Sequence, residues 1–268
     1  GMIQRITRGG VDVDINTLYK DNVVDGRFAF KSAALSATAT GVASLKDRRF
    51  VGMNIDSRVT QPQALMPSMK GRDLRATLRL DGPFMAPRYN YRITSPRIEF
   101  GRNILNTVDI RGTGNWSAGT IQSIPMRASV ASITGNGEMA DALTRNVTVD
   151  GTFRLRGNEL SSNLMQVRTS RINGQMVVNA DLSSGRYNVG FDGRLPGYEI
   201  PGLGRVDIVS KLKVSPLGSG INVVGNAVAQ VTRLDNSFFK TLAGGNPRLT
   251  TDLVMTPESY STFGWNLR

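Results

Sequence analysis

Residues 171–195 read RINGQMVVNADLSSGRYNVGFDGRL, and this stretch decides the fold class. In its first half, the even positions from 176 to 182 are apolar and most of their neighbours are polar. After a Ser-Ser-Gly segment, the odd positions 187, 189 and 191 are apolar instead. A period of two is typical of a β-strand with one buried face. The stretch therefore predicts two strands joined by a turn.

The same alternation recurs along the chain. Turn-forming residues such as Arg-Gly-Gly (8–10), Gly-Asn-Gly (135–137) and Asn-Gly (173–174) stand between the alternating segments. Short strands joined by tight turns indicate antiparallel pairing, because parallel strands need long crossover connections. The chain is therefore predicted to be all-β, an antiparallel meander. The alternating segments are 11–15, 53–59, 74–80, 89–93, 146–156, 206–214 and 249–255.

The apolar register changes once within a predicted strand. Ile93 is at an odd position, whereas Ile98 and Phe100 are at even ones, and Ser95-Pro96 lies between them. A bulge or bend at Ser95-Pro96 would return both halves to the same face of the sheet.

One or two short helices are expected beside the strands. Residues 138–146 have room for two turns. Residues 233–245 are a better candidate, because Asp235 or Asn236 can cap the first turn and Gly244-Gly245 can end the helix. Its apolar side would hold Phe238, Phe239 and Leu242.

The composition argues against catalysis. The chain has no Cys and no His, which excludes disulfides, thiolate nucleophiles and acid–base schemes that use histidine. Asp12 and Asp14 lie two apart on the polar side of a predicted strand, where solvated carboxylates are expected. We therefore expect no enzyme activity, no metal site and no cofactor.

The charge favours anionic partners. The formal net charge is +12, and 26 of the 33 basic residues are Arg. An anionic membrane surface fits this charge, and so would a basic nucleic-acid-binding β domain. Single-strand binders place aromatic and basic residues on one exposed face. Here Arg154 and Arg156 point away from Phe153 and Leu155, so nucleic acid is not the expected partner.

One apolar face on every strand must be covered. A second sheet would make a sandwich, closure would make a barrel, and curling around a ligand would make an elongated trough. The expected form is a trough or a sandwich, and a lipid-like ligand and a sealed protein core both suit the apolar composition. The expected lining residues are Val147, Val149, Phe153, Leu155, Met176, Val178, Tyr187, Val189 and Phe191.

No linker divides the sequence, so residues 1–268 are expected to form a single elongated β domain. Gly1-Met2 has the form of a tag remnant, and the chain is expected to be a fragment of a longer protein. There is no run of about 18 apolar residues that would span a membrane.

Four segments carry a resemblance to a known family: RINGQMVVNADLSSGRYNVGFDG (171–193), GRDLRATLRLDGPFMAPRYNYRI (71–93), IPGLGRVD (200–207) and VTRLDNSFFKTLAGG (231–245). They resemble the TamB proteins, which belong to the AsmA-like group of bacterial envelope proteins. The resemblance is to α-proteobacterial members and covers most of residues 50 to 255.

The resemblance implies a long sheet folded lengthwise into a trough with an apolar lining, a β-taco-like form. It implies a periplasmic protein anchored in the inner membrane of a Gram-negative bacterium. It further implies phospholipid acyl chains as ligands, transport between the two membranes, and assembly of outer-membrane proteins with an outer-membrane barrel partner. A closed-core scaffold or a protein-interaction domain is the alternative.

Overall fold

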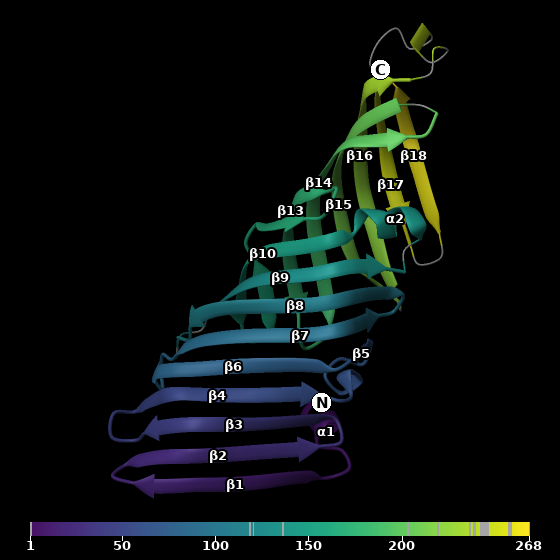
Figure 1. Ribbon diagram of the computed structural model, residues 1–268. Coiled ribbons are helices and arrows are strands. Elements are labelled where there is room, and N and C mark those ends of the chain that lie inside the picture. Colours follow the sequence, from purple (N-terminus) through teal and green to yellow (C-terminus); the bar gives the residue numbers. More distant parts are fainter. Residues whose placement is uncertain are drawn as a thin grey trace.

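The structure is a computed structural model (Figure 1). It describes residues 2–117, 119, 121–135, 137–202, 204–218, 220–235, 237, 240–241, 247–256 and 259–267.

Eighteen strands in these residues form one antiparallel sheet, which confirms the all-β meander. Each strand pairs with the one before and the one after it in the chain, apart from two interruptions described below. The strands are β1 (Val11–Lys20), β2 (Val23–Ser32), β3 (Leu35–Ser44), β4 (Arg49–Val59), β5 (Met69–Arg72), β6 (Leu74–Pro83), β7 (Arg88–Phe100), β8 (Asn103–Asn115), β9 (Gln122–Thr134), β10 (Arg145–Arg156), β11 (Glu159–Ser162), β12 (Met165–Arg168), β13 (Asn173–Asp181), β14 (Arg186–Ile200), β15 (Gly204–Leu217), β16 (Gly220–Leu234), β17 (Arg248–Met255) and β18 (Tyr260–Leu267).

Two rows of the sheet are each made of two strands: the four-residue β5 with the ten-residue β6, and the four-residue β11 and β12. β5 and β6 both pair with β7, and β11 and β12 both lie between β10 and β13. The described strands therefore form sixteen rows, and at ~4.8 Å per row the sheet is about 70 Å long. Figure 1 shows the strand direction turning along the stack, from the flat rows β1–β9 to the steep rows β14–β18. Since the strands belong to one sheet, the trough and not the two-sheet sandwich describes the fold.

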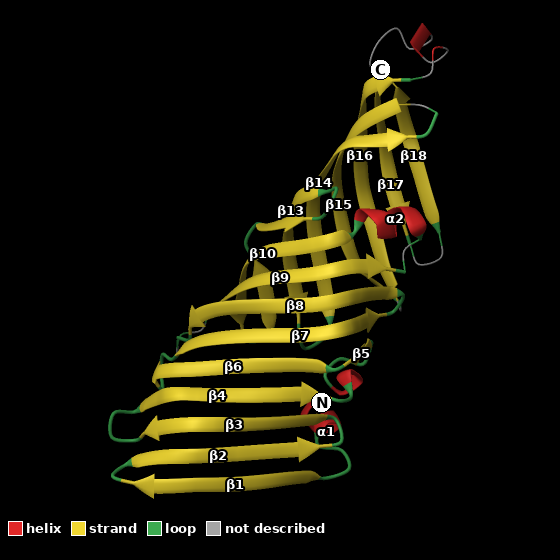
Figure 2. Ribbon diagram, in the orientation of Figure 1, coloured by secondary structure: helices red, strands yellow, loops and turns green. Residues whose placement is uncertain are grey.

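Helices are few and lie at the ends of the strands (Figure 2). Those whose residues are all described are α1 (Met2–Ile6), the 3-10 turn η1 (Pro62–Ala64) and α2 (Glu138–Leu143). The helix predicted in 138–146 is confirmed as α2. The helix predicted over 233–245 lies largely outside the described residues. The sequence did not indicate α1. The turn predicted at Asn173–Gly174 is wrong, because both residues belong to β13.

The best-buried residues follow one line across the sheet, which we call the crease. Val108 pairs with Ser95 on one side and Val130 on the other, and Val130 pairs in turn with Val147. Each of these residues is at most 8% exposed. Val59 and Leu74, which pair with each other, extend the crease into β4 and β6.

The strands change their facing at the crease. Leu105 and Val108 are three residues apart, and in a regular strand they would point to opposite faces. Both nevertheless pack in the same core cluster, as do Val130 and Ile133 on β9. Residues on the two sides of the crease therefore face the same interior, which makes the crease the floor of a trough.

Residues in the left-handed backbone conformation explain why the strands change their facing at the crease. Asp73, Thr107 and Asn146 have φ of 51°, 53° and 52°, and each directly precedes a crease residue. A residue in this conformation shifts the alternation by one position, as in a β-bulge. The register change predicted at Ser95-Pro96 lies on this line. There the Ser95 hydroxyl accepts a hydrogen bond from Arg97 N and lies 2.8 Å from Arg72 O.

A second part of the crease crosses β14–β16. Val206 pairs with Val231, and they are 1% and 8% exposed. Gly197 has φ of 61°, beside a register shift that follows Leu195. Gly197 N donates a hydrogen bond to Asp207 Oδ1 at 2.7 Å. The loop predicted over 197–205 is therefore mostly strand, and it bends the sheet.

The interior of the trough is not closed by a second layer. A compact protein of 29.1 kDa would expose about 11,400 Å², whereas this chain exposes 16795 Å². The excess area fits an elongated single sheet that leaves one face uncovered.

Candidate functional site

All nine predicted lining residues lie on one face of β10–β14. Leu155 pairs with Leu160, Leu160 with Ala180, and Ala180 with Tyr187. Residues directly opposite each other in antiparallel strands share a face. The other predicted residues are an even number of positions away from these on the same strands, so they share the same face. The residues chosen from the sequence pattern therefore form one surface.

The nine residues occupy two environments. Val147 is 7% exposed and belongs to the core cluster, and Val149 packs against that cluster. These two residues form part of the crease. The other seven are half-buried and stand on the longer wall of the trough, where they face the open interior.

The apolar face extends beyond the predicted residues in both directions. Toward the C-terminus, Val189 pairs with Val214, and Val214 with Val223. A row toward the N-terminus reaches β1. Its members, paired in turn, are Tyr91, Leu78, Ile55, Ala39, Phe28 and Ile15.

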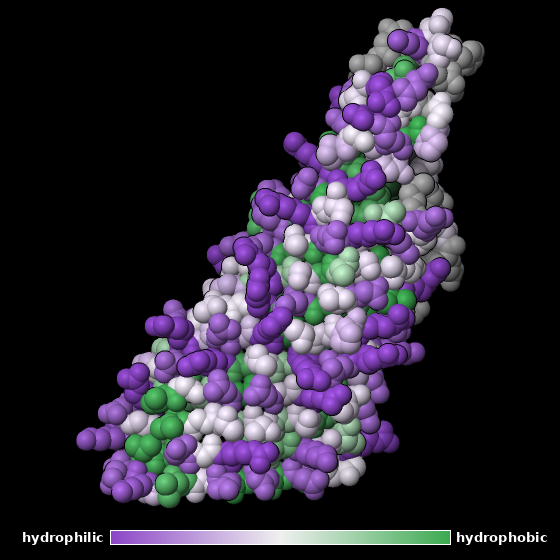
Figure 3. Space-filling view, in the orientation of Figure 1, coloured by the Kyte–Doolittle hydropathy of each residue, from purple (hydrophilic) through white to green (hydrophobic). Residues whose placement is uncertain are grey.

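The opposite face is polar and carries ion pairs. Arg92 NH2 lies 2.7 Å from Asp109 Oδ2, and Arg127 NH2 lies 2.6 Å from Asp150 Oδ2. The hydrogen bond from Arg92 holds the pKa of Asp109 below its usual value. Figure 3 shows hydrophilic side chains over most of the visible surface. Arginines and apolar residues thus stay on separate faces, unlike the surface of a single-strand binder.

An aromatic hollow of about 470 Å³ opens on the apolar face of β6–β9. None of the nine lining residues predicted from the sequence belongs to it. Tyr89 is 8% exposed, whereas Trp116 at its edge is 46% exposed. Its lining is Leu78, Leu80, Phe84, Pro87, Tyr89, Tyr91, Trp116 and Ile124.

Two glycines allow the tyrosine rings to lie across the sheet. A Cβ on Gly114 would meet the Tyr89 ring, and one on Gly112 would meet the Tyr91 ring. The hydroxyls reach β9, where Tyr89 donates to Ser123 O at 2.7 Å and Tyr91 donates to Pro125 O at 2.9 Å. Burial raises the pKa of both phenols. With their polar ends bonded, the rings present apolar surface to the interior.

A signal for the hollow was present in the sequence. The alternation over 89–93 places both tyrosines on the apolar side, and glycines recur at 112 and 114. What joins them is the pairing of Tyr91 with Gly112 and Tyr89 with Gly114, and that register is fixed only in the folded sheet.

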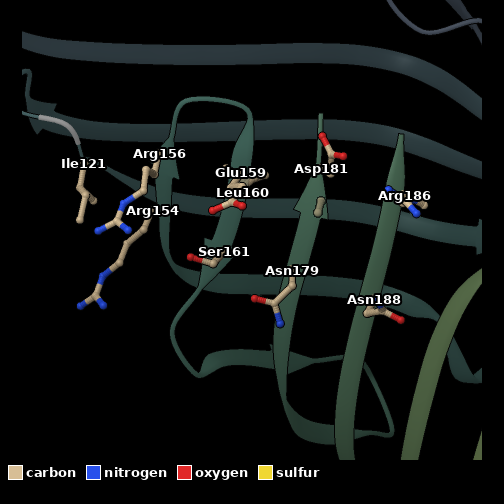
Figure 4. Close-up of a pocket in the computed structure, with 11 residues that line it drawn as sticks. Ile121, Arg154, Arg156, Glu159, Leu160, Ser161, Asn179, Asp181, Arg186 and Asn188 are labelled. Carbon is tan, nitrogen blue, oxygen red and sulfur yellow. The ribbon is translucent and has the colours of Figure 1, made fainter. Parts of the chain in front are cut away.

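A polar hollow of about 610 Å³ lies on the outer face, beside the β10–β11 and β13–β14 turns (Figure 4). Arg154 pairs with Ser161, Ser161 with Asn179, and Asn179 with Asn188, which makes one row across four strands. Figure 4 shows Arg154 and Arg156 extending away from β11, on the side where Ile121 lies. Neither arginine has an ion-pair partner among the described residues.

These surfaces offer contact area to a ligand. Within the described ranges, no group of three or more acidic side chains is arranged to hold a metal ion. None of the helices in those ranges combines the length and apolar character needed to cross a bilayer. The apolar face contributes side-chain surface and two phenols whose hydroxyls are hydrogen-bonded.

Comparison with known proteins gives no family for this arrangement: no family model, no curated protein and no solved structure matches the chain.

Proposed function

We propose that the chain is a lipid-binding segment whose trough holds phospholipid acyl chains. The observation that carries the proposal is the mostly apolar face that the strands from β1 to β16 turn toward the interior. Each acyl CH₂ removed from water contributes about 0.8 kcal/mol. The half-buried apolar residues of the wall provide this contact. Polar residues in their rows are few, and Ser162, which pairs with Phe153, has its hydroxyl bonded by Val178 N at 2.8 Å.

The wall suits retention without a single deep site. Rows such as Val178, Val189 and Val214 present similar side chains at each strand. An acyl chain would gain nearly the same contact at successive positions along the trough, so it could slide. The aromatic hollow is lined mainly by aromatic and aliphatic side chains and is the position where we expect a chain to stay longest.

The resemblance to TamB proteins supports a wider role. On that basis we propose a non-catalytic, periplasmic segment of an envelope protein anchored in the inner membrane. Such a segment would support phospholipid transport between the inner and outer membranes. It would also support outer-membrane protein assembly together with an outer-membrane barrel protein.

The first experiment is native mass spectrometry of the purified protein, followed by solvent extraction and identification of bound lipid. Phospholipid at substantial occupancy is the expected result. A lipid-free, monodisperse monomer would contradict the proposal and favour a scaffold or protein-interaction domain.

A matched pair of variants locates the bound lipid. Val189→Asp places a charge on the wall and should reduce lipid occupancy while the sheet stays folded. Asn188→Asp places the same charge on the outer face of the same strand and should leave occupancy unchanged. Equal occupancy in both variants would place the lipid elsewhere.

A further inference from the structure

The turns at one end of the strands form a continuous edge of the molecule, which we call the rim. It comprises the β1–β2, β3–β4, β6–β7, β8–β9, β10–β11 and β13–β14 connections. Backbone hydrogen bonds of 2.8 to 2.9 Å join neighbouring turns of the rim to each other. They run from Leu45 N to Asn22 O, from Phe84 N to Arg48 O, from Trp116 N to Pro87 O, and from Leu182 N to Asn158 O.

Large side chains of these turns, and Tyr19 at the adjoining end of β1, are exposed to solvent. Single exposed apolar residues are normal on a protein surface, but a repeated series is not. Figure 3 shows hydrophobic side chains gathered at the rim ends of β1–β4. The exposed fractions are 61% for Tyr19, 47% for Leu45, 70% for Met85, 46% for Trp116 and 56% for Leu182.

Three of these side chains, Leu45, Met85 and Leu182, are not part of the trough lining described above. Beneath Met85, the rings of Phe50 and Phe84 already pack together with centroids 4.7 Å apart. Leu45 and Leu182 lie in the turns, outside the rows of paired residues. Their exposure therefore calls for a surrounding that the folded chain does not supply.

Basic residues accompany the apolar ones. Lys46 and Arg48 lie in the turn that carries Leu45, and Arg88 follows Met85. Arg154 and Arg156 extend from the outer face close to the rim (Figure 4). Basic residues on the rim outnumber acidic ones: Lys20, Lys46, Arg48, Arg49, Arg88, Arg154, Arg156 and Arg186 against Asp21, Asp47, Asp81, Glu159 and Asp181.

We propose that the rim docks on the surface of an anionic phospholipid bilayer. Exposed Leu, Met, Trp and Tyr side chains would enter the boundary between headgroups and acyl chains, and Lys and Arg would contact the anionic headgroups. The combination of exposed apolar side chains with neighbouring basic ones favours this occupant, because a bilayer of anionic lipid offers partners to both. The trough would then lie along the membrane with one long edge in contact with it.

The test is co-sedimentation with vesicles of phosphatidylcholine, with and without an equal part of phosphatidylglycerol. The rim variant replaces Leu45, Met85 and Leu182 by Ser, and the control variant replaces the exposed Leu164 and Val209 by Ser. Circular dichroism checks that both variants keep the sheet. We expect the rim variant to bind mixed vesicles about tenfold or more weakly and the control to stay within about twofold of the parent. Added salt and pure phosphatidylcholine should each weaken binding of the parent.

Three results would overturn the proposal: no binding of the parent chain to mixed vesicles, equal binding of the rim variant and the parent, or equal loss in both variants. Lipid held in the trough is measured separately, by native mass spectrometry of the rim variant. Unchanged occupancy together with lost vesicle binding would assign the two properties to different surfaces.

Discussion

The crease and the wall use the same amino acids in different surroundings. Val108 and Val130 on the crease are 3% and 8% exposed, whereas Val178 and Val189 on the wall are half-buried. All four face the interior, and all four lie on strands in which inward-facing and outward-facing residues alternate. The difference teaches that the pattern assigns a face, while the distance from the fold line decides whether an apolar residue stabilises the sheet or remains available to a ligand.

The largest effect should come from placing a charge on the crease. Val108→Asp would leave a carboxylate without a partner among the core residues, and we expect it to destabilise the fold by about 3 to 5 kcal/mol. Val189→Asp on the wall should cost much less, because its carboxylate can reach water. Urea unfolding followed by circular dichroism measures both. Similar losses in the two variants would erase the distinction between crease and wall.

The next effect concerns the glycines beneath the aromatic hollow. A Cβ at Gly112 would lie 1.9 Å from Pro125 O and 2.6 Å from the Tyr91 ring. Gly112→Ala should therefore cost about 1 to 3 kcal/mol through overpacking. Gly190, also within a strand, has nothing within 4 Å of such a Cβ, so Gly190→Ala should be neutral or slightly stabilising. A neutral Gly112→Ala would mean that the Tyr91 ring does not need this space.

The sequence predicted the faces well and the crease only at one point. Period-two alternation was enough to place Phe153, Val178 and Tyr187 on one surface, since side chains in a strand must alternate. It could not separate Val147 from Val189, because burial depends on neighbouring strands and on the fold line between them. Only Ser95-Pro96 gave a visible signal of that line.

The other crease positions lacked a signal for a physical reason. Asp and Asn tolerate a positive φ, but they are common on any polar face, so Asp73 and Asn146 did not stand out. Thr107 is β-branched, a type that rarely adopts this conformation, and nothing in the sequence would suggest it. The sheet around Thr107 imposes its φ through the pairing on both sides.

A smaller effect follows from the strain at Thr107. The side chain is exposed and the residue has φ of 53°, so Thr107→Gly should raise stability by about 0.5 to 1 kcal/mol. Thr148 is exposed on β10 in the extended conformation, and Thr148→Gly should lower stability instead. If the sheet imposes the left-handed conformation on Thr107, the urea midpoint should rise in Thr107→Gly and fall in Thr148→Gly, each relative to the parent protein. A loss in both would mean that Thr107 is not strained.

The smallest effect should be the pH dependence of an outer-face pair, away from both crease and wall. Arg92 donates to both carboxylate oxygens of Asp109, at 3.1 and 2.7 Å, and these bonds lower the pKa of Asp109 in the folded protein. The pair therefore contributes stability above the ordinary carboxyl pKa, and that contribution is lost as the pH falls through the lowered value. Exposure to solvent keeps it small.

Substituting the arginine tests whether the Arg92–Asp109 ion pair affects lipid binding in the trough. In an NMR titration of the side-chain carboxyl, Arg92→Gln should raise the pKa of Asp109 toward its ordinary value, although Arg111 continues to lower it. Arg127→Gln removes an equally exposed arginine paired with Asp150 and should leave Asp109 unchanged. Lipid occupancy should be the same in both variants, because these side chains lie on the face opposite the apolar rows. A change in occupancy with either variant would mean that the two faces are coupled through the strands, and the wall could no longer be treated as independent of the ion pairs behind it.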